Sequence, residues 1–168
     1  MNNNMQQQTT INIQEKANLI WAIADKLVGV YKPHEYGNVI LPMCVIKRFE
    51  DTLAPTKQAV LDTNAKLDKD GIVVKKGFLE TAAGQQFYNL SPFTFQSLLN
   101  DPENIKENFE SYLNHFSENV IDIIHRMDFD RELQKMADNN VLYLVIKEFC
   151  TAKAYFGADV VTLSLIHI

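Results

Sequence analysis

Apolar residues recur at every third or fourth position along most of the chain, which is the spacing of one face of an α-helix. In the first such run, Asn12 and Glu15 form a capping-box pattern, and Gly29 and Pro33 follow the last apolar position. Further runs occupy 33–53, 56–69, 94–99, 103–127, 130–138 and 141–153. The alternating pattern of strands is nearly absent. The sequence therefore predicts a mainly α fold, a compact bundle of about six to seven helices.

The most apolar run is 35–53, with the sequence EYGNVILPMCVIKRFEDTL and a proline, Pro42, in its middle. A proline inside a helix removes one backbone hydrogen bond and kinks the helix, and a kinked helix can wrap around a core. The run ends in four charged residues. These favour either helix-surface ion pairs worth a few tenths of a kcal/mol, or contacts with a neighbouring domain, subunit or DNA. The four are Lys47, Arg48, Glu50 and Asp51.

The segment 71–93 is the least regular part of the chain. It holds three glycines and a short β-like run from Ile72 to Val74, so we expect an irregular or β-like segment with a helical turn near 78–85. Lys75 and Lys76 lie within it. Because loops carry function more often than helices do, these two lysines are candidates for contact with a phosphate.

Catalytic constellations are not found in the sequence. The four histidines lack metal-ligand spacing, no serine lies in a G-x-S-x-G motif, and the six glycines form no phosphate loop. The two cysteines, Cys44 and Cys150, lie in apolar helical runs and are expected to be buried free thiols. We therefore predict no catalytic, cofactor-binding or metal-binding residue.

Length and net charge narrow the classes of protein that this sequence can belong to. The 168 residues suit one domain, and the net charge of −5 differs from that of a free-standing DNA-binding module, which is usually basic. Residues 1–60 carry six basic against five acidic residues, whereas 61–168 carry ten against sixteen. A nucleic-acid contact would then come from a local patch or from a partner.

Residues 1–12 are polar and expected to form a disordered arm. Without a signal-peptide pattern or a long apolar run, we expect a cytoplasmic protein that does not enter a membrane.

Two long stretches resemble a known family. The start of the modification (M) subunit of type I restriction–modification systems is closely similar to 19–61, LIWAIADKLVGVYKPHEYGNVILPMCVIKRFEDTLAPTKQAVL. The similarity continues through GFLETAAGQQFYNLSPFTFQSLLNDPENIKENFESYLNHFSENVIDII to about KEFC, and covers 13–157. The resemblance implies that 13–157 is the helical N-terminal domain that precedes a Rossmann-like catalytic domain.

The resemblance also implies an activity and partners. Such subunits are N6-adenine DNA methyltransferases that use S-adenosylmethionine and flip the target adenine out of double-stranded DNA. Two M subunits bind one specificity subunit, and a restriction subunit can join them. The helical domain is expected to serve DNA clamping and subunit contact, with Lys47, Arg48, Lys75 and Lys76 as candidate contacts. The alternative is a non-enzymatic helical interaction module, or a truncated remnant, that does not bind DNA.

This sequence also departs from the family pattern. It lacks the Gly-rich cofactor loop and the Asn-Pro-Pro-aromatic tetrapeptide of the catalytic domain, and its last residues, 158–168, differ from the expected continuation. We therefore expect the 168 residues alone to bind no S-adenosylmethionine and to transfer no methyl group.

Overall fold

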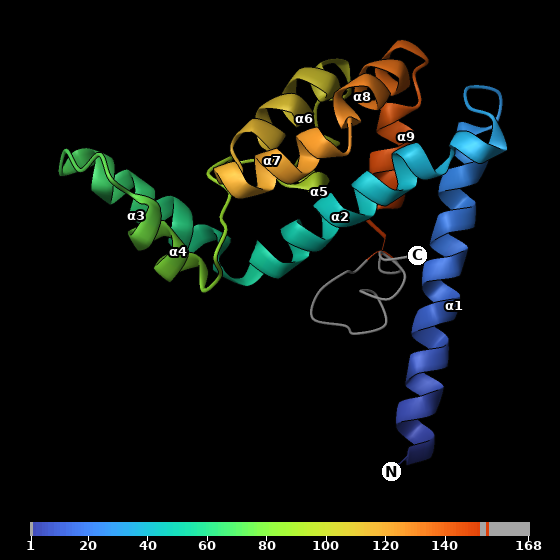
Figure 1. Ribbon diagram of the computed structural model, residues 1–168, viewed down its shortest axis with the longest axis horizontal. Coiled ribbons are helices and arrows are strands. Elements are labelled where there is room, and N and C mark those ends of the chain that lie inside the picture. The colour runs from blue at the N-terminus through green and yellow to red at the C-terminus, as the bar shows by residue number, and fades with distance from the viewer. Residues whose placement is uncertain (1, 152–153, 155–168) are drawn as a thin grey trace.

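The computed structural model describes residues 2–151 and 154, with side chains from residue 13 onwards (Figure 1). Its described residues are mainly helical and form no sheet, with only two isolated bridges between extended residues. The mainly α prediction is confirmed. The helices are α1 (Asn2–Leu27), α2 (Gly37–Leu53), α3 (Lys57–Lys69), α4 (Lys76–Ala83), α5 (Phe95–Leu98), α6 (Ile105–Asn114), α7 (Glu118–Arg126), α8 (Phe129–Asp138) and α9 (Leu142–Glu148).

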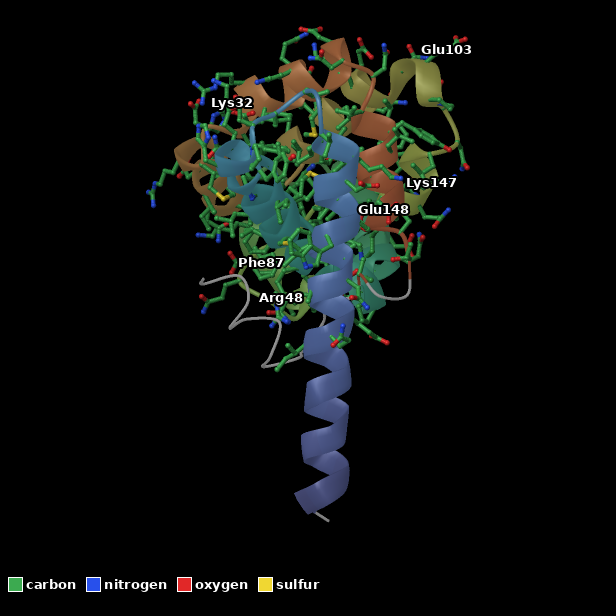
Figure 2. The ribbon with its side chains drawn as sticks, turned by 90° about the vertical axis from the view of Figure 1, so that its right-hand side faces the viewer. Lys32, Arg48, Phe87, Glu103, Lys147 and Glu148 are labelled. Atoms are coloured by element: carbon green, nitrogen blue, oxygen red, sulfur yellow. The ribbon has the colours of Figure 1, made fainter. Side chains whose placement is uncertain are left out.

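Helix α1 differs from its prediction at its start. It begins at Asn2 rather than near Asn12, so the expected arm at 1–12 is helical from Asn2 onwards, and Figure 2 shows this half of α1 beyond the body of the molecule. It ends at Leu27, close to the end predicted near 28–30, and the nearby Gly29 adopts a left-handed φ of 88°. Trp21 belongs to the apolar spacing, yet its side chain is 75% exposed. The division into an arm and a domain stays a prediction.

Helix α2 runs through the centre of the molecule and continues past Pro42, which is buried. Pro33 begins a short 3₁₀ turn, Pro33–Glu35, rather than α2 itself, which begins at Gly37. The predicted stripe along α2 faces the core, with Val39, Met43 and Ile46 fully buried. Burial on more than one side explains why this run is the most apolar of the chain.

A cluster of aromatic rings fills the space between α5, α6, α8 and α9. The Phe95 ring lies edge-on to three others, with centroid distances of 5.8 Å to Phe109, 6.0 Å to Tyr112 and 6.2 Å to Phe149. Phe129 extends the cluster from α8 at 6.3 Å from Phe109. Edge-to-face pairs of this kind stabilise a core beyond the area that they bury.

The single long helix predicted over 103–127 is wrong: the chain forms α6 and α7 with a break between them. Hydrogen bonds to residues 88–90, a segment distant in the sequence, stabilise the break. The N–H of Leu90 donates to the carbonyl of His115 at 2.9 Å, and the N–H of Ser117 donates to the carbonyl of Tyr88 at 2.9 Å. These bonds replace intrahelical ones, so the helix can end without leaving buried backbone groups unsatisfied.

Helices α3 and α4 form a hairpin at one end of the molecule (Figure 1). The β-like run at 72–74 is irregular rather than a strand. The helical turn expected near 78–85 is α4, which ends at Ala83 and is capped by Gly84 with φ of 68°. At the turn of the hairpin Val73 is 89% exposed and Val74 is 82% exposed. This end of the molecule thus presents apolar side chains to solvent.

The ends of the chain bear on two further predictions. Helix α9 begins as expected but stops at Glu148, and the predicted atypical tail at 158–168 lies outside the described residues. Within the described part of the chain, the search for a helix that is long and apolar enough to cross a membrane finds none.

Candidate functional site

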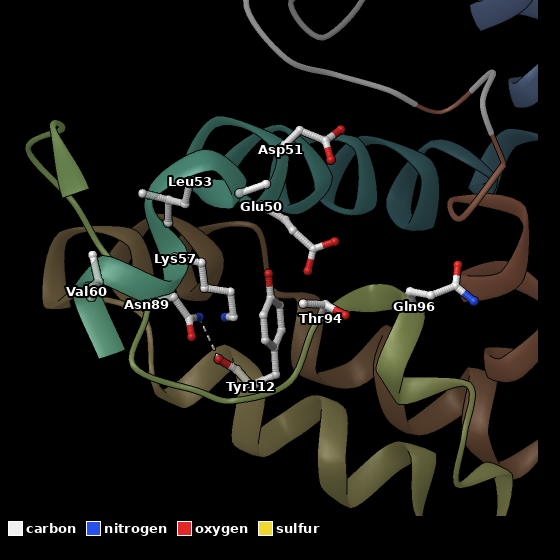
Figure 3. Close-up of a pocket in the computed structure, with 10 residues that line it drawn as sticks. Glu50, Asp51, Leu53, Lys57, Val60, Asn89, Thr94, Gln96 and Tyr112 are labelled. Carbon is white, nitrogen blue, oxygen red and sulfur yellow. Dashed lines mark hydrogen bonds between the residues drawn. The ribbon is translucent and has the colours of Figure 1, made fainter. Parts of the chain in front are cut away.

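A pocket lies at the C-terminal end of α2, against the start of α3, the segment before α5, and α6 (Figure 3). Its volume is about 200 Å³. Glu50 points into it from α2, Lys57 from α3 and Tyr112 from α6, as the close-up shows. Three ionisable side chains from distant parts of the sequence therefore meet at one junction of helices.

Glu50 connects α2 to α5 and α6. Its carboxylate accepts a hydrogen bond of 2.8 Å from the N–H of Phe95, the first residue of α5, whose N–H has no partner within its own helix. The Tyr112 hydroxyl, from α6, points towards the same carboxylate (Figure 3). Burial raises the pKa of Glu50, and burial together with Glu50 raises the pKa of Tyr112 well above its usual 10.0.

Lys57 and Asn89 complete the pocket. The Lys57 ammonium lies 5.7 Å from the centroid of the Tyr112 ring, and burial lowers the pKa of this lysine despite the attraction of Glu50. The Asn89 side chain donates to the carbonyl of Tyr112 at 3.0 Å and accepts from the N–H of Ser91 at 2.7 Å. Glu50 and Asn89 thus each hold one segment against another, which makes the pocket a structural junction.

The described residues offer no alternative centre for chemistry. Among them, no group of three or more histidine, cysteine, aspartate or glutamate side chains is placed to hold a metal ion. Both cysteines are free; Cys44 is buried and Cys150 half-buried rather than buried. Burial raises the pKa of Cys44 to about 12 and that of Cys150 to about 11, so neither thiol forms a reactive thiolate at neutral pH.

The candidate contacts on α2 are not on an open surface. Lys47 forms the predicted ion pair with Asp51, at 2.6 Å, but both side chains are only 9% exposed, so the expected surface pair is a buried pair. Arg48, one residue on, is half-buried. Burial leaves the Lys47 ammonium little surface for DNA or a neighbouring subunit. As contact residues, Lys47 and Arg48 stay predictions.

The candidate contacts on the hairpin differ from each other. Lys75 is turned towards α3, where its ammonium pairs with Asp68 and donates to the Asn64 side chain at 3.0 Å. Lys76 is 79% exposed and lies 3.9 Å from Glu80. The structure brings these two lysines together along one groove but keeps them apart from Lys47, which lines another cavity.

Two features were missed by the sequence analysis. The junction of Glu50, Lys57 and Tyr112 has no signal in the sequence, because each residue comes from a different helix. The exposed valines did leave a signal. Val73 and Val74 were expected to belong to a short β-like run, in which no alternation with polar residues predicted a buried face for them.

Comparison with known protein families shows the family to which this chain belongs. A model of the HsdM N-terminal domain family matches residues 16–149, which is most of the chain. The chain belongs to the HsdM N-terminal domain family. Its fold is therefore that of the N-terminal part of a type I restriction–modification methyltransferase subunit, a protein that works in a complex with other subunits. Comparison with curated proteins and with solved structures finds no match.

Proposed function

We propose that this HsdM N-terminal domain serves subunit contact and DNA clamping in a type I restriction–modification methyltransferase. In the intact enzyme the methyltransferase would use S-adenosylmethionine to methylate adenine at N6 in double-stranded DNA. The partners would be a specificity subunit, a second M subunit and a restriction subunit, in the cytoplasm. Membership of the family over 16–149 carries this proposal.

The shape of the molecule supports a contact role. The α3–α4 hairpin lies at one end of the molecule, and its turn exposes Val73 and Val74. Large exposed apolar side chains next to one another are typical of surfaces that bind another protein. The neighbouring Lys76 is the most exposed of the four candidate contacts and supplies a cation that could meet a phosphate.

A second candidate function is a protein-interaction module that binds no DNA. The net charge of −5 favours it, because a protein without a strong basic patch gains little from the release of counterions on DNA. The exposed valines of the hairpin suit either candidate. Affinity for DNA separates the two.

The test is a titration of the 168-residue chain with labelled duplex DNA over a range of salt concentrations. If Lys76 contacts a phosphate, Lys76→Ala weakens binding and lowers the slope of log affinity against log salt by about 1. Lys75→Ala is a poorer probe because it also frees Asp68 and Asn64. Lys32→Ala is the matched control, since this exposed lysine lies in the loop between α1 and α2, at the other end of the molecule.

The two candidate functions predict different results in these titrations. Salt-dependent binding that Lys76→Ala weakens and Lys32→Ala leaves unchanged supports DNA clamping. Binding to the specificity subunit without affinity for DNA supports the interaction module instead. We also propose that these 168 residues alone transfer no methyl group, and methylation of duplex DNA by the purified chain with S-adenosylmethionine would contradict this.

A further inference from the structure

The turn of the α3–α4 hairpin exposes an apolar tip, which consists of Val73, Val74 and Phe78. These side chains are 89%, 82% and 54% exposed. The backbone of both valines makes no hydrogen bond within the described part of the chain. The tip therefore offers apolar side chains and free backbone donors and acceptors at the same place, which is the combination that an extended segment of another protein can use.

An acidic groove begins at the tip and runs between α4 and the start of α7. Its volume is about 520 Å³, and Val74 and Tyr88 are among the residues that line it. Its acidic residues are Glu80, Glu118 and Asp122. Of its two basic residues, Lys75 pairs with Asp68, whereas Lys76 is 79% exposed and lies 3.9 Å from Glu80. The groove thus carries more negative than positive charge.

Two of these carboxylates are available to a partner. Glu118 and Asp122 are exposed on α7 and make no ion pair with any described residue. Glu118 also acts on a neighbouring side chain: burial, Glu80 and Glu118 all raise the pKa of Tyr88, and only Lys75 opposes them. An incoming cation would meet these two carboxylates on the α7 side of the groove.

We propose that the apolar tip and the acidic groove form one docking surface for a segment of a neighbouring protein subunit, with apolar side chains flanked by lysine or arginine. The apolar side chains cover Val73, Val74 and Phe78, and the basic ones lie along Glu118 and Asp122. This deepens the subunit contact of the proposed function and rests on it for the source of the segment. Glu118 and Asp122 favour a basic segment on the α7 side of the groove, whereas the candidate phosphate contact, Lys76, lies on the α4 side.

The test uses peptides of about twelve residues, a length that covers a groove of this kind. The first peptide carries leucine and valine flanked by lysine, the second replaces each lysine by glutamate, and the third replaces each apolar residue by serine. Binding of each peptide to the 168-residue chain is measured by fluorescence anisotropy at low and high salt. We expect the first peptide to bind about ten-fold more tightly than either of the others.

Two double variants test whether the first peptide binds at the apolar tip and the acidic groove. Val73→Ser with Val74→Ser should weaken the first peptide about ten-fold at every salt concentration. Glu118→Gln with Asp122→Asn should remove the preference for lysine over glutamate and the dependence on salt. Leu144→Ser is the control, because Leu144 is 39% exposed on α9. Equal binding of the first two peptides, or binding that the paired variants leave unchanged, would overturn the docking surface.

The same variants, titrated with the purified specificity subunit and with a second M subunit, separate this inference from the proposed function. If the wild-type chain binds a subunit and the paired variants bind it equally well, the docking surface is wrong and subunit contact stands. If the peptide preference holds but neither subunit binds the wild-type chain, the proposed function fails while the docking surface stands.

Discussion

The end of α2 and the start of α4 each hold a lysine four residues before an acidic residue, in opposite environments. The Lys47 and Asp51 side chains are 9% exposed and their charged atoms lie 2.6 Å apart. On α4, Lys76 is 79% exposed and lies 3.9 Å from Glu80. Identical spacing thus yields a buried structural pair in one helix and a loose surface pair in the other. Because of this difference in burial, the charge of Lys47 stabilises the fold, whereas the charge of Lys76 is available to a partner.

The largest expected effect comes from Lys47→Ala. Removal of one member of a buried ion pair leaves the other charge in a poorly solvated place, so we expect the free energy of unfolding to fall by about 3 kcal/mol. Lys76→Ala, its matched control, should change it by less than about 0.5 kcal/mol. Urea denaturation followed by circular dichroism measures both. Equal losses in the two variants would show that the two pairs do not differ as described.

A smaller loss is expected from Asn89→Ala, which tests the break between α6 and α7. Asn89 is 4% exposed, donates to the Tyr112 carbonyl at 3.0 Å and accepts from the Ser91 N–H. Its removal leaves both buried backbone groups without that partner, at a cost of about 2 kcal/mol. The matched control is Asn108→Ala, whose side chain makes one exposed contact at 3.4 Å. An Asn89→Ala chain as stable as this control would mean that the break does not depend on Asn89.

The pH dependence of stability tests the junction around Glu50. Its pKa is raised in the folded state, so the stability it contributes is present below its usual pKa of 4.5 and is lost as pH rises through the raised value. Glu50→Gln keeps an acceptor for the Phe95 N–H and removes the charge. Compared with this variant, the wild type should lose stability as pH rises above about 4.5, by less than the effect of Asn89→Ala. Parallel stability curves for the two proteins would contradict the burial of this charge.

The smallest effect on stability is expected at the apolar tip. Val73 and Val74 are 89% and 82% exposed, so their replacement by serine removes almost no packing. We expect the free energy of unfolding to change by less than about 0.5 kcal/mol. Thermal unfolding of the double variant measures this. A marked loss of stability would place the valines in the fold itself and weaken their assignment to a partner.

Much of the fold could be predicted from the spacing of apolar residues within each helix. We predicted the core face of α2, the end of α1 near Gly29 and the helix over 56–69, because each depends on neighbouring residues. The α6–α7 break was missed because Tyr88 and Leu90, far away in the sequence, supply its hydrogen bonds. The burial of Lys47 was missed for the same reason: spacing indicates a pair but not what covers it.

The candidate site shows the same limit. Lys75 and Lys76 were singled out as neighbours in a loop, but only their tertiary partners distinguish them. Trp21 fits the apolar spacing of α1 and is nevertheless 75% exposed, since periodicity cannot indicate whether a face has a neighbour.

Hydrogen exchange of the chain, alone and within the reconstituted methyltransferase complex, tests the central claim most directly. That claim is that the hairpin and its groove make contacts, whereas the end of α2 holds the fold. The account predicts new protection on assembly at 72–78 and 118–122, and unchanged exchange at 47–53. Protection that appears at 47–53 and leaves 72–78 unchanged would contradict it.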